Sequence, residues 1–298
     1  DALIIKMNNL CEPQWVIVYG GDTNSIGQGG YGFDLATGIA INNSGQVYVT
    51  GYTSSRDFPL FAGNNLFFDT KNGCTIPTCW DIFILKLNNS GIPLWVSFYG
   101  ADNVDETASD IDIDNNQNVY IVGHGTKFST LQNQTGASNF ILGNGIILKF
   151  NPQDSLIWAS LLGVERVTGS ESIYAIAVNS VDNKYICGVT TNPTSQQPFP
   201  VINPGVNSNY SGGNTDGFFA KFDNNDLLVS STLVGGAGDD DVKGITTDPS
   251  GNIYMTGFTN SLNFPTKNMG DSAYFVDTLT YNTNVGIKKD AYLMKLDT

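Results

Sequence analysis

The acidic run Asp239-Asp240-Asp241 is the first place where this sequence could do chemistry. Oxygen-rich loops can bind Ca²⁺, which takes six to eight oxygen ligands. The spacing is not that of an EF-hand loop, so two interpretations stay open. The carboxylates either form solvated turns and capping groups, or they are candidate calcium ligands, with calcium as the only expected cofactor. A pair of carboxylates could also support glycoside cleavage, although spacing in sequence does not establish such a pair.

The usual parts of nucleophilic and phosphate chemistry are missing from the sequence. His124 is the only histidine, and no Ser–His–Asp pattern or glycine-rich phosphate loop accompanies it. We therefore expect a protein that is not an enzyme. A carbohydrate-active enzyme using paired acids is the least favoured alternative.

Cys74 and Cys79 enclose the tetrapeptide Thr-Ile-Pro-Thr within a long predicted loop. This arrangement predicts a local disulfide in an oxidising compartment, with free thiols as the alternative. A zinc site would need two further ligands, which the surrounding sequence does not supply.

Composition excludes several classes of partner. The chain has 28 acidic and 14 basic residues, and its net charge of −14 opposes binding to nucleic acid. No run of about 18 apolar residues is present, so we expect no membrane-spanning helix. Charged residues make up only 14% of the chain. A surface made polar mainly by Asn, Ser, Thr and Gly is typical of a secreted protein, so we expect an extracellular or cell-surface location.

Five similar apolar segments, each carrying one lysine, show how the chain is organised. The intervals between successive lysines range from 63 residues (149 − 86) to 80 residues (86 − 6). A pattern that returns at such an interval indicates a repeat architecture. We expect the lysine stems to lie along the strands and their ammonium groups to pair with turn oxygens. The lysines are Lys6, Lys86, Lys149, Lys221 and Lys295.

Each repeat contains four short strand-like runs, here called A to D, and the lysine lies in C. Gly- and Asn-containing turns separate A from B and C from D. Trp15, Trp95 and Trp158 begin the apolar part of three D runs. No segment has a convincing helical period, so the pattern predicts an all-β protein with less than about 8% helix. The expected fold is a β-propeller, or a propeller segment, of four-stranded antiparallel blades in about four repeats.

The whole chain 1–298 is expected to form one β-propeller-like domain. The predicted units are 1–36 (a partial unit with C and D only), 37–107, 108–172, 173–242 and 243–298 (lacking its last strand).

Residues 37–59 and 243–265 carry a recognisable pattern, preceded in the second case by Gly235-Gly236-Ala237-Gly238-Asp239-Asp240. The pattern resembles the SBBP β-propeller repeat of secreted and surface bacterial proteins. The resemblance implies a propeller fold and display at or outside the cell surface. It transfers no catalytic residue, because the repeat has none.

The B–C connections are long, at about 54–80, 125–143, 191–215 and 260–289. Connections of this length are uncommon unless they are functional, so the face that they share with the D–A connections is the candidate interaction surface. Large apolar residues in these loops either anchor the loops by local packing or contact a protein or glycan partner. The candidate contact residues are Phe61, Phe67, Trp80, Phe140, Tyr210, Tyr274 and Tyr281.

Three functions follow from this pattern. The first is a non-catalytic binding or adhesion module that acts through the B–C loops. The second is a structural subunit of a filament or surface assembly. The sequence has five C runs but four each of A, B and D, and a surplus strand could pair with a neighbouring molecule. The third is the carbohydrate-active enzyme.

Overall fold

The computed structural model describes residues 1–21, 32–62, 79–101, 104–125, 143–163, 171–191, 199–203, 205–206, 209–266 and 289–296. Within these ranges the chain is all-β and contains no helix, so the predicted fold class is confirmed. The strands are β1 (Ala2–Met7), β2 (Pro13–Tyr19), β3 (Asp34–Ile41), β4 (Val47–Thr53), β5 (Asp81–Leu87), β6 (Pro93–Tyr99), β7 (Glu106–Ile113), β8 (Val119–Gly125), β9 (Gly145–Phe150), β10 (Leu156–Leu162), β11 (Glu171–Val178), β12 (Lys184–Thr191), β13 (Thr215–Phe222), β14 (Leu228–Val234), β15 (Asp240–Thr247), β16 (Ile253–Thr259) and β17 (Asp290–Leu296).

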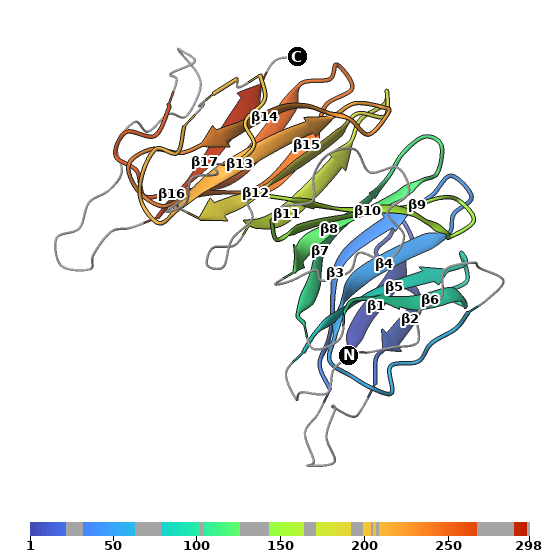
Figure 1. Cartoon of the computed structure of the whole chain (residues 1–298). Coiled ribbons are helices and arrows are strands. Elements are labelled where there is room, and N and C mark those ends of the chain that lie inside the picture. Colours follow the sequence, from blue (N-terminus) through green and yellow to red (C-terminus); the bar gives the residue numbers. More distant parts are fainter. Residues whose placement is uncertain are drawn as a thin grey trace. The chain divides into compact units, whose positions relative to one another are not determined.

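The strands form small sheets in chain order (Figure 1). Three sheets have four strands, namely β3–β6, β7–β10 and β11–β14, and each of these is one propeller-type blade. The β15–β17 sheet has three strands, and β1–β2 is a two-stranded hairpin. The chain divides into two compact units, Asp1–Leu161 and Leu162–Thr298, which are described separately below.

The expected order of A, B, C and D strands is the observed order within each four-stranded sheet. Trp15, Trp95 and Trp158 occupy the third position of β2, β6 and β10, so their equivalence is confirmed. The A strands share an irregularity, because the register shifts at the same place in all four of them. A bulge repeated in this way is a regular feature of the blade. It bends the A strand and increases its twist.

A five-residue turn built around Asn or Asp joins A to B and C to D. In the turn after β3, the Asn42 side-chain oxygen accepts hydrogen bonds from the backbone N–H groups of Ser44 (3.1 Å) and Gln46 (2.9 Å). Gly45 adopts the left-handed region, with φ of 72°, where glycine has no steric cost. The same hydrogen bonds recur at Asn8, Asn88, Asn151, Asn179, Asp223 and Asp248. These turns define one end of each blade, called the turn end; the B–C and D–A connections define the opposite loop end.

The repeated lysines behave as predicted where their contacts are described. Lys6 Nζ donates to the turn oxygens of Asn89. Lys86 forms a buried ion pair with Asp154 in another C–D turn, at 2.7 Å. Four of the lysines also lie over a B-strand tyrosine ring, a partner that the sequence analysis did not identify. The pairs are Lys86–Tyr48, Lys149–Tyr120, Lys221–Tyr185 and Lys295–Tyr254.

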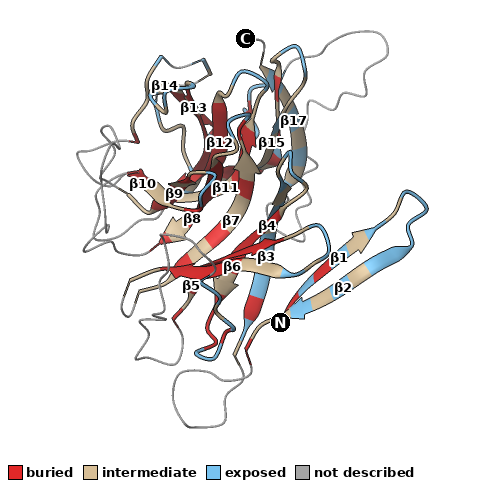
Figure 2. Cartoon of the chain, turned by 90° about the vertical axis from the view of Figure 1, so that its right-hand side faces the viewer, coloured by how far each residue is buried: buried red, intermediate tan, exposed pale blue. Residues whose placement is uncertain are grey.

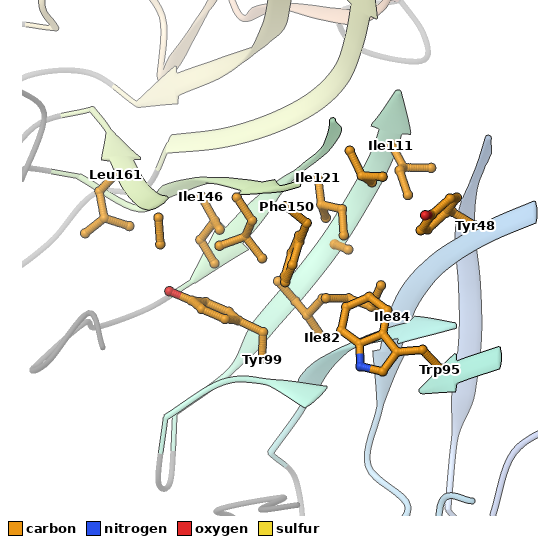
Figure 3. Packing of buried hydrophobic residues seen from close by; sticks show 14 residues of the cluster. Tyr48, Ile82, Ile84, Trp95, Tyr99, Ile111, Ile121, Ile146, Phe150 and Leu161 are labelled. Atoms are coloured by element: carbon orange, nitrogen blue, oxygen red, sulfur yellow. The ribbon is translucent and has the colours of Figure 1, made fainter. Parts of the chain in front are cut away.

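The core of the first unit lies between neighbouring sheets. Trp95 from β6 is fully buried and meets the Phe150 ring edge-on, with ring centroids 5.6 Å apart. Ile84, Ile121 and neighbouring aliphatic side chains fill the space around this pair (Figure 3). Fully burying an aliphatic or aromatic side chain contributes about 1.5–3 kcal/mol, so these sheet-to-sheet contacts hold the blades together.

A Phe-Pro dipeptide follows three of the B strands, and its phenylalanine is buried in a core in each case. Phe58 contacts the rings of Phe83 and Phe98, Phe199 contacts Phe218, and Phe264 belongs to the core of the second unit. The chain then continues onto the outer strand of the blade in two cases. Phe61 bridges Val96 of β6, and Ile202 bridges Ser231 of β14.

One face of the β1–β2 hairpin is packed and the other is exposed (Figure 2). Ala2 and Ile4 are buried against the β3–β6 sheet. The opposite face presents five apolar side chains to solvent with exposed fractions of 40–63%. These are Leu3, Ile5, Met7, Val16 and Val18.

A search of the described residues finds no helix with the length and hydropathy needed to cross a membrane.

Candidate functional site

Buried carboxylates line the loop end of the blades and form the main polar feature of this end. Each A strand begins with an acid, and two C strands carry a buried aspartate at their first (Asp81) or second (Asp216) position. All six side chains are at most 5% exposed. These six residues are called the carboxylate row: Asp34, Asp81 and Glu106 in the first unit, and Glu171, Asp216 and Asp240 in the second.

Hydrogen bonds from the connecting segments explain why acids occupy these positions. Gly21 N–H donates to Asp34 (2.9 Å), Ala101 N–H to Glu106 (3.3 Å) and Gly236 N–H to Asp240 (2.8 Å). Each donor lies in the D–A connection that leads into the strand. The A-strand acid therefore fastens its own D–A connection to the sheet.

A glycine follows the D strand at the places where a larger side chain would collide with the carboxylate row. A Cβ atom on Gly235 would contact the carboxylates of both Asp216 and Asp240. A Cβ on Gly100 would likewise contact Asp81. These glycines are needed for close approach of the carboxylates to the backbone.

Burial changes the acidity of two members of the row. The pKa of Glu106 is raised to about 8, mainly by desolvation; a hydrogen bond from Ala101 lowers it, and the negative charges of Asp81 and Asp105 add to the rise. Desolvation raises the pKa of Asp216 to about 7, opposed by the Ser211 N–H and reinforced by Asp240 and Asp239. Burial penalises the charged form of a carboxyl group, so these two groups retain protons at pH values where an exposed acid is ionised.

The predicted calcium ligands bind different partners. Asp239 accepts a hydrogen bond from Asn214 N–H (2.6 Å), Asp240 from Ser261 Oγ (2.6 Å), and Asp241 pairs with Lys243 (3.0 Å). Within the described ranges, no group of three or more His, Cys, Asp or Glu side chains is placed to hold a metal ion.

Three aromatic side chains gather at the loop end of the first unit. Trp80 precedes β5 and meets the Tyr52 ring edge-on, at 5.1 Å between centroids. Phe33 lies 6.1 Å from Trp80 and is 64% exposed, whereas the other two rings are half-buried. Phe33, Tyr52 and Trp80 are called the aromatic cluster. It contains one predicted contact residue, Trp80, and two that the sequence analysis missed.

Backbone hydrogen bonds join the aromatic cluster to the carboxylate row. Trp80 N–H donates to the Asp105 carboxylate (3.1 Å), and the Glu106 N–H donates to the Trp80 carbonyl oxygen (2.7 Å). The position of Trp80 therefore depends on Asp105, which precedes β7, and on Glu106, which begins it.

The equivalent position in the second unit has different chemistry. Phe258 corresponds to Tyr52, since each follows the glycine of its B strand. Lys289 Nζ lies 3.6 Å from the centre of the Phe258 ring, and Lys243 Nζ lies 3.5 Å from that of Tyr174. Lys243 Nζ also lies 5.5 Å from the centre of the Phe258 ring, so two cations lie over the phenylalanine in the described structure.

The other predicted contact residues do not gather at one place among the described residues. Phe61 is half-exposed on the outer edge of β6, and Tyr210 is partly buried in the second unit. Phe67, Phe140, Tyr274 and Tyr281 lie outside the described residues.

The predicted disulfide is described at one of its two cysteines. Cys79 is buried and disulfide-bonded, while Cys11 and Cys187 are not part of a disulfide. Cys74 lies outside the described residues, so its pairing with Cys79 stays a prediction.

Comparison with known proteins supports the class of protein that this architecture defines. Residues 231–265 match the SBBP family, described as a beta-propeller repeat, which confirms the resemblance seen in the sequence. The protein is thus an all-β protein that contains a β-propeller repeat of the SBBP type.

More distant comparisons add little. A solved structure, a member of the duf4221 family from Bacteroides vulgatus, aligns with 8% sequence identity and a TM-score of 0.24. The alignment covers 78% of this chain and 89% of that one. No curated protein matches the chain.

Proposed function

We propose that this protein is a non-catalytic binding or adhesion module that acts outside the cell and holds its ligand at the loop end of its blades. The observation that carries the proposal is the aromatic cluster of Phe33, Tyr52 and Trp80. Apolar side chains that are grouped at a surface often mark an interaction site, and Tyr and Trp combine an apolar face with a polar edge. Sugar rings offer a matching combination of apolar and hydroxyl-bearing surfaces, so the proposed ligand is a glycan.

Electrostatics narrows the choice of glycan. The net charge of −14 repels polyanions such as sulfated or uronate-rich chains. The proposed ligand is therefore an uncharged polysaccharide or oligosaccharide.

Burial argues against hydrolysis of that glycan by the carboxylate row. A glycosidase needs both carboxyl groups at the scissile bond. Asp81 and Glu106 are both 0% exposed, as are Asp216 and Asp240. These acids support the fold and the position of the loops, which favours binding without turnover.

A glycan array tests the binding proposal. We expect the wild-type protein to bind at least one uncharged glycan, and we expect Phe33→Ala to weaken that binding at least tenfold. Phe33 is largely exposed, so its replacement should leave the fold intact. Leu10→Ala is the matched control, because Leu10 is 72% exposed in a turn at the opposite end of the same unit. The proposal is contradicted if the wild-type protein binds no uncharged glycan on the array, or if Phe33→Ala and Leu10→Ala weaken binding equally. Selective binding of a protein partner instead would show that the ligand is not a glycan.

A second candidate function is a structural subunit that joins neighbouring molecules through its terminal strands. The exposed apolar face of the β1–β2 hairpin favours it, together with the three-stranded β15–β17 sheet. An edge strand with unpaired backbone groups can accept another strand. Light scattering and electron microscopy of the chain, with and without residues 1–20, test this candidate. A protein that stays monomeric and equally stable without that segment rules it out.

A further inference from the structure

Glu106 is a fully buried acid at the junction of two blades. Its side chain is 0% exposed, and its Oε2 atom accepts one long hydrogen bond, from Ala101 N–H at 3.3 Å. Its Oε1 atom is buried and accepts no hydrogen bond from the described part of the chain. An ionised carboxylate in this position would lack the donors that normally stabilise a buried charge.

The groups that face Glu106 are themselves acidic or neutral. Asp81 begins β5 and Asp105 precedes Glu106 in the chain, and both place negative charge near it. The Tyr99 hydroxyl of β6 is buried close enough for the charge of Glu106 to raise its pKa. Repulsion from these two carboxylates favours the neutral acid, as like charges do in other buried carboxyl sites.

Two oxygens are enough to hold a proton, whereas Ca²⁺ needs six to eight oxygen ligands. Asp81, Asp105 and Glu106 do not form a group that could hold a metal ion in the described structure. We propose that Glu106 carries a proton at neutral pH, and that this proton fixes the junction between β5 and β7 and, through it, the position of Trp80. The structure thereby contains a proton-sensitive support for the loop end of the first unit.

The path from the proton to Trp80 is short. Glu106 N–H donates to the Trp80 carbonyl oxygen, and the Asp105 carboxylate accepts from the Trp80 N–H. The two acids at the start of β7 therefore also hold the backbone of Trp80. Loss of the proton places a negative charge on the buried Glu106 beside the charges of Asp81 and Asp105. The separation of β5 from β7 that relieves this repulsion pulls directly on Trp80. An effect of this proton on ligand binding rests on the proposed function. Protonation of Glu106 is independent of that function.

The direction of the pH effect follows from linkage. The pKa of Glu106 is about 8 in the folded protein, above the value of about 4.3 for an unperturbed glutamate. The folded state then binds one more proton than the unfolded state between these values. The stabilisation is complete below about pH 4.3 and is lost as the pH rises towards 8. The unfolding equilibrium constant should therefore increase up to about tenfold per pH unit over this window because of Glu106 alone.

The first experiment counts protons on the wild-type protein without any ligand. Potentiometric titration compares folded and urea-unfolded protein, and urea unfolding is followed from pH 5 to 9 at constant ionic strength. Glu106→Gln keeps the shape and neutrality of the protonated acid. We expect this variant to fold and to reduce the pH dependence by about one proton relative to the wild type. Asp248→Asn is the control, because Asp248 belongs to an exposed turn and its pKa is lowered, so the slope above pH 5 should not change.

Infrared spectroscopy gives a second measurement that does not depend on a variant's stability. A protonated carboxyl band that is lost with a midpoint near pH 8 should be present in the folded wild-type protein and missing from Glu106→Gln, whereas the band of Asp216, whose pKa is about 7, should be present in both. Asp81→Asn removes a neighbouring negative charge that raises the pKa of Glu106, so it should shift the loss of the Glu106 band to lower pH. Absence of the Glu106 band at pH 7, or identical pH slopes for the wild type and Glu106→Gln, overturns the proposal.

Calcium and Trp80 fluorescence complete the test. The unfolding series at pH 8 is repeated with millimolar calcium and with a chelator. If calcium stabilises the wild type but not Glu106→Gln, the site binds a cation instead of a proton, and the proposal is wrong. Subtracting the fluorescence spectrum of a Trp80→Phe variant isolates the emission of Trp80. This emission should shift between pH 6 and 9 in the wild-type background and stay constant in the Glu106→Gln background. Failure to find a glycan ligand would contradict the proposed function and leave these outcomes unaffected.

Discussion

The β5–β6 hairpin and the β1–β2 hairpin have closely matching sequences but very different surroundings. Both contain a C strand with one lysine, a five-residue turn that begins at asparagine, and a D strand with tryptophan in third position. Val96 in β6 is 0% exposed, while its counterpart Val16 in β2 is 53% exposed. The alternation of side chains fixes which residues share a face. A neighbouring sheet decides whether that face is buried.

The largest difference is expected at the two tryptophans. Trp95→Ala should lower the free energy of unfolding by about 3–5 kcal/mol, because a fully buried large ring leaves a cavity. Trp15 is only half-buried, so Trp15→Ala should cost clearly less. Urea unfolding monitored by circular dichroism measures both. Equal losses would show that the two hairpins have the same surroundings in solution.

The paired lysines should differ almost as much. The Lys86–Asp154 pair is buried, with side chains 7% and 3% exposed, and Tyr48 donates a hydrogen bond to the same carboxylate at 3.0 Å. Lys86→Met leaves Asp154 buried without its cation, which should cost about 3 kcal/mol. Lys6 binds Asn89 at the surface, and Lys6→Met should cost less than about 1 kcal/mol. Thermal unfolding of both variants decides the matter, and a small effect at Lys86 would mean that water reaches the ion pair.

The valine pair tests burial with the same substitution at both sites. Val96→Ala removes about two buried methylene equivalents and should cost about 1.5 kcal/mol. Val16→Ala should change stability by less than about 0.5 kcal/mol. If Val16→Ala proves as costly as Val96→Ala, the exposed hairpin face is covered in solution, which would support assembly of neighbouring molecules.

The smallest effect should be the same in both hairpins. Asn8 and Asn88 each accept two backbone hydrogen bonds within their own turn, at 2.9–3.0 Å. Replacing either asparagine with alanine should cost about 1 kcal/mol, because the turn does not depend on a neighbouring sheet. Amide hydrogen exchange of Leu10 and Ser90 measures each turn separately, and protection lost in only one of them would contradict a purely local origin.

The order of the strands could be predicted from the sequence because it depends on local patterns that repeat. The apolar alternation around Trp95 and the Asn-Ser-Gly turn after β3 identify strands and turns without knowledge of their neighbours. Burial could not be predicted in the same way, as the two valines show. The acids of the carboxylate row were visible as Asp81 and Asp216 at the start of C runs. An aspartate at the same place in two repeats could have indicated a structural role, but only the lysines were noted as a repeated feature of the C runs.

The aromatic cluster could be predicted only in part. Trp80 stood out as a large apolar residue in a long connection. Phe33 and Tyr52 come from a different connection and from the end of a B strand, and only pairing of β4 with β5 brings these parts of the chain together. The same is true of the pKa of Glu106, which depends on Asp81 from another sheet.

The short bridges that Phe61 and Ile202 make with the outer strands have a consequence for polymer growth. Each bridge occupies backbone groups on the rim of its blade, at Val96 and Ser231. Chain association at the rim of β6 or β14 would have to displace these contacts first. The free edges of β1 and β17 carry no such cover in the described structure. Strand pairing with a neighbouring molecule is therefore opposed at β6 and β14, but not at β10, the outer strand of the β7–β10 blade, for which the described structure has no such bridge.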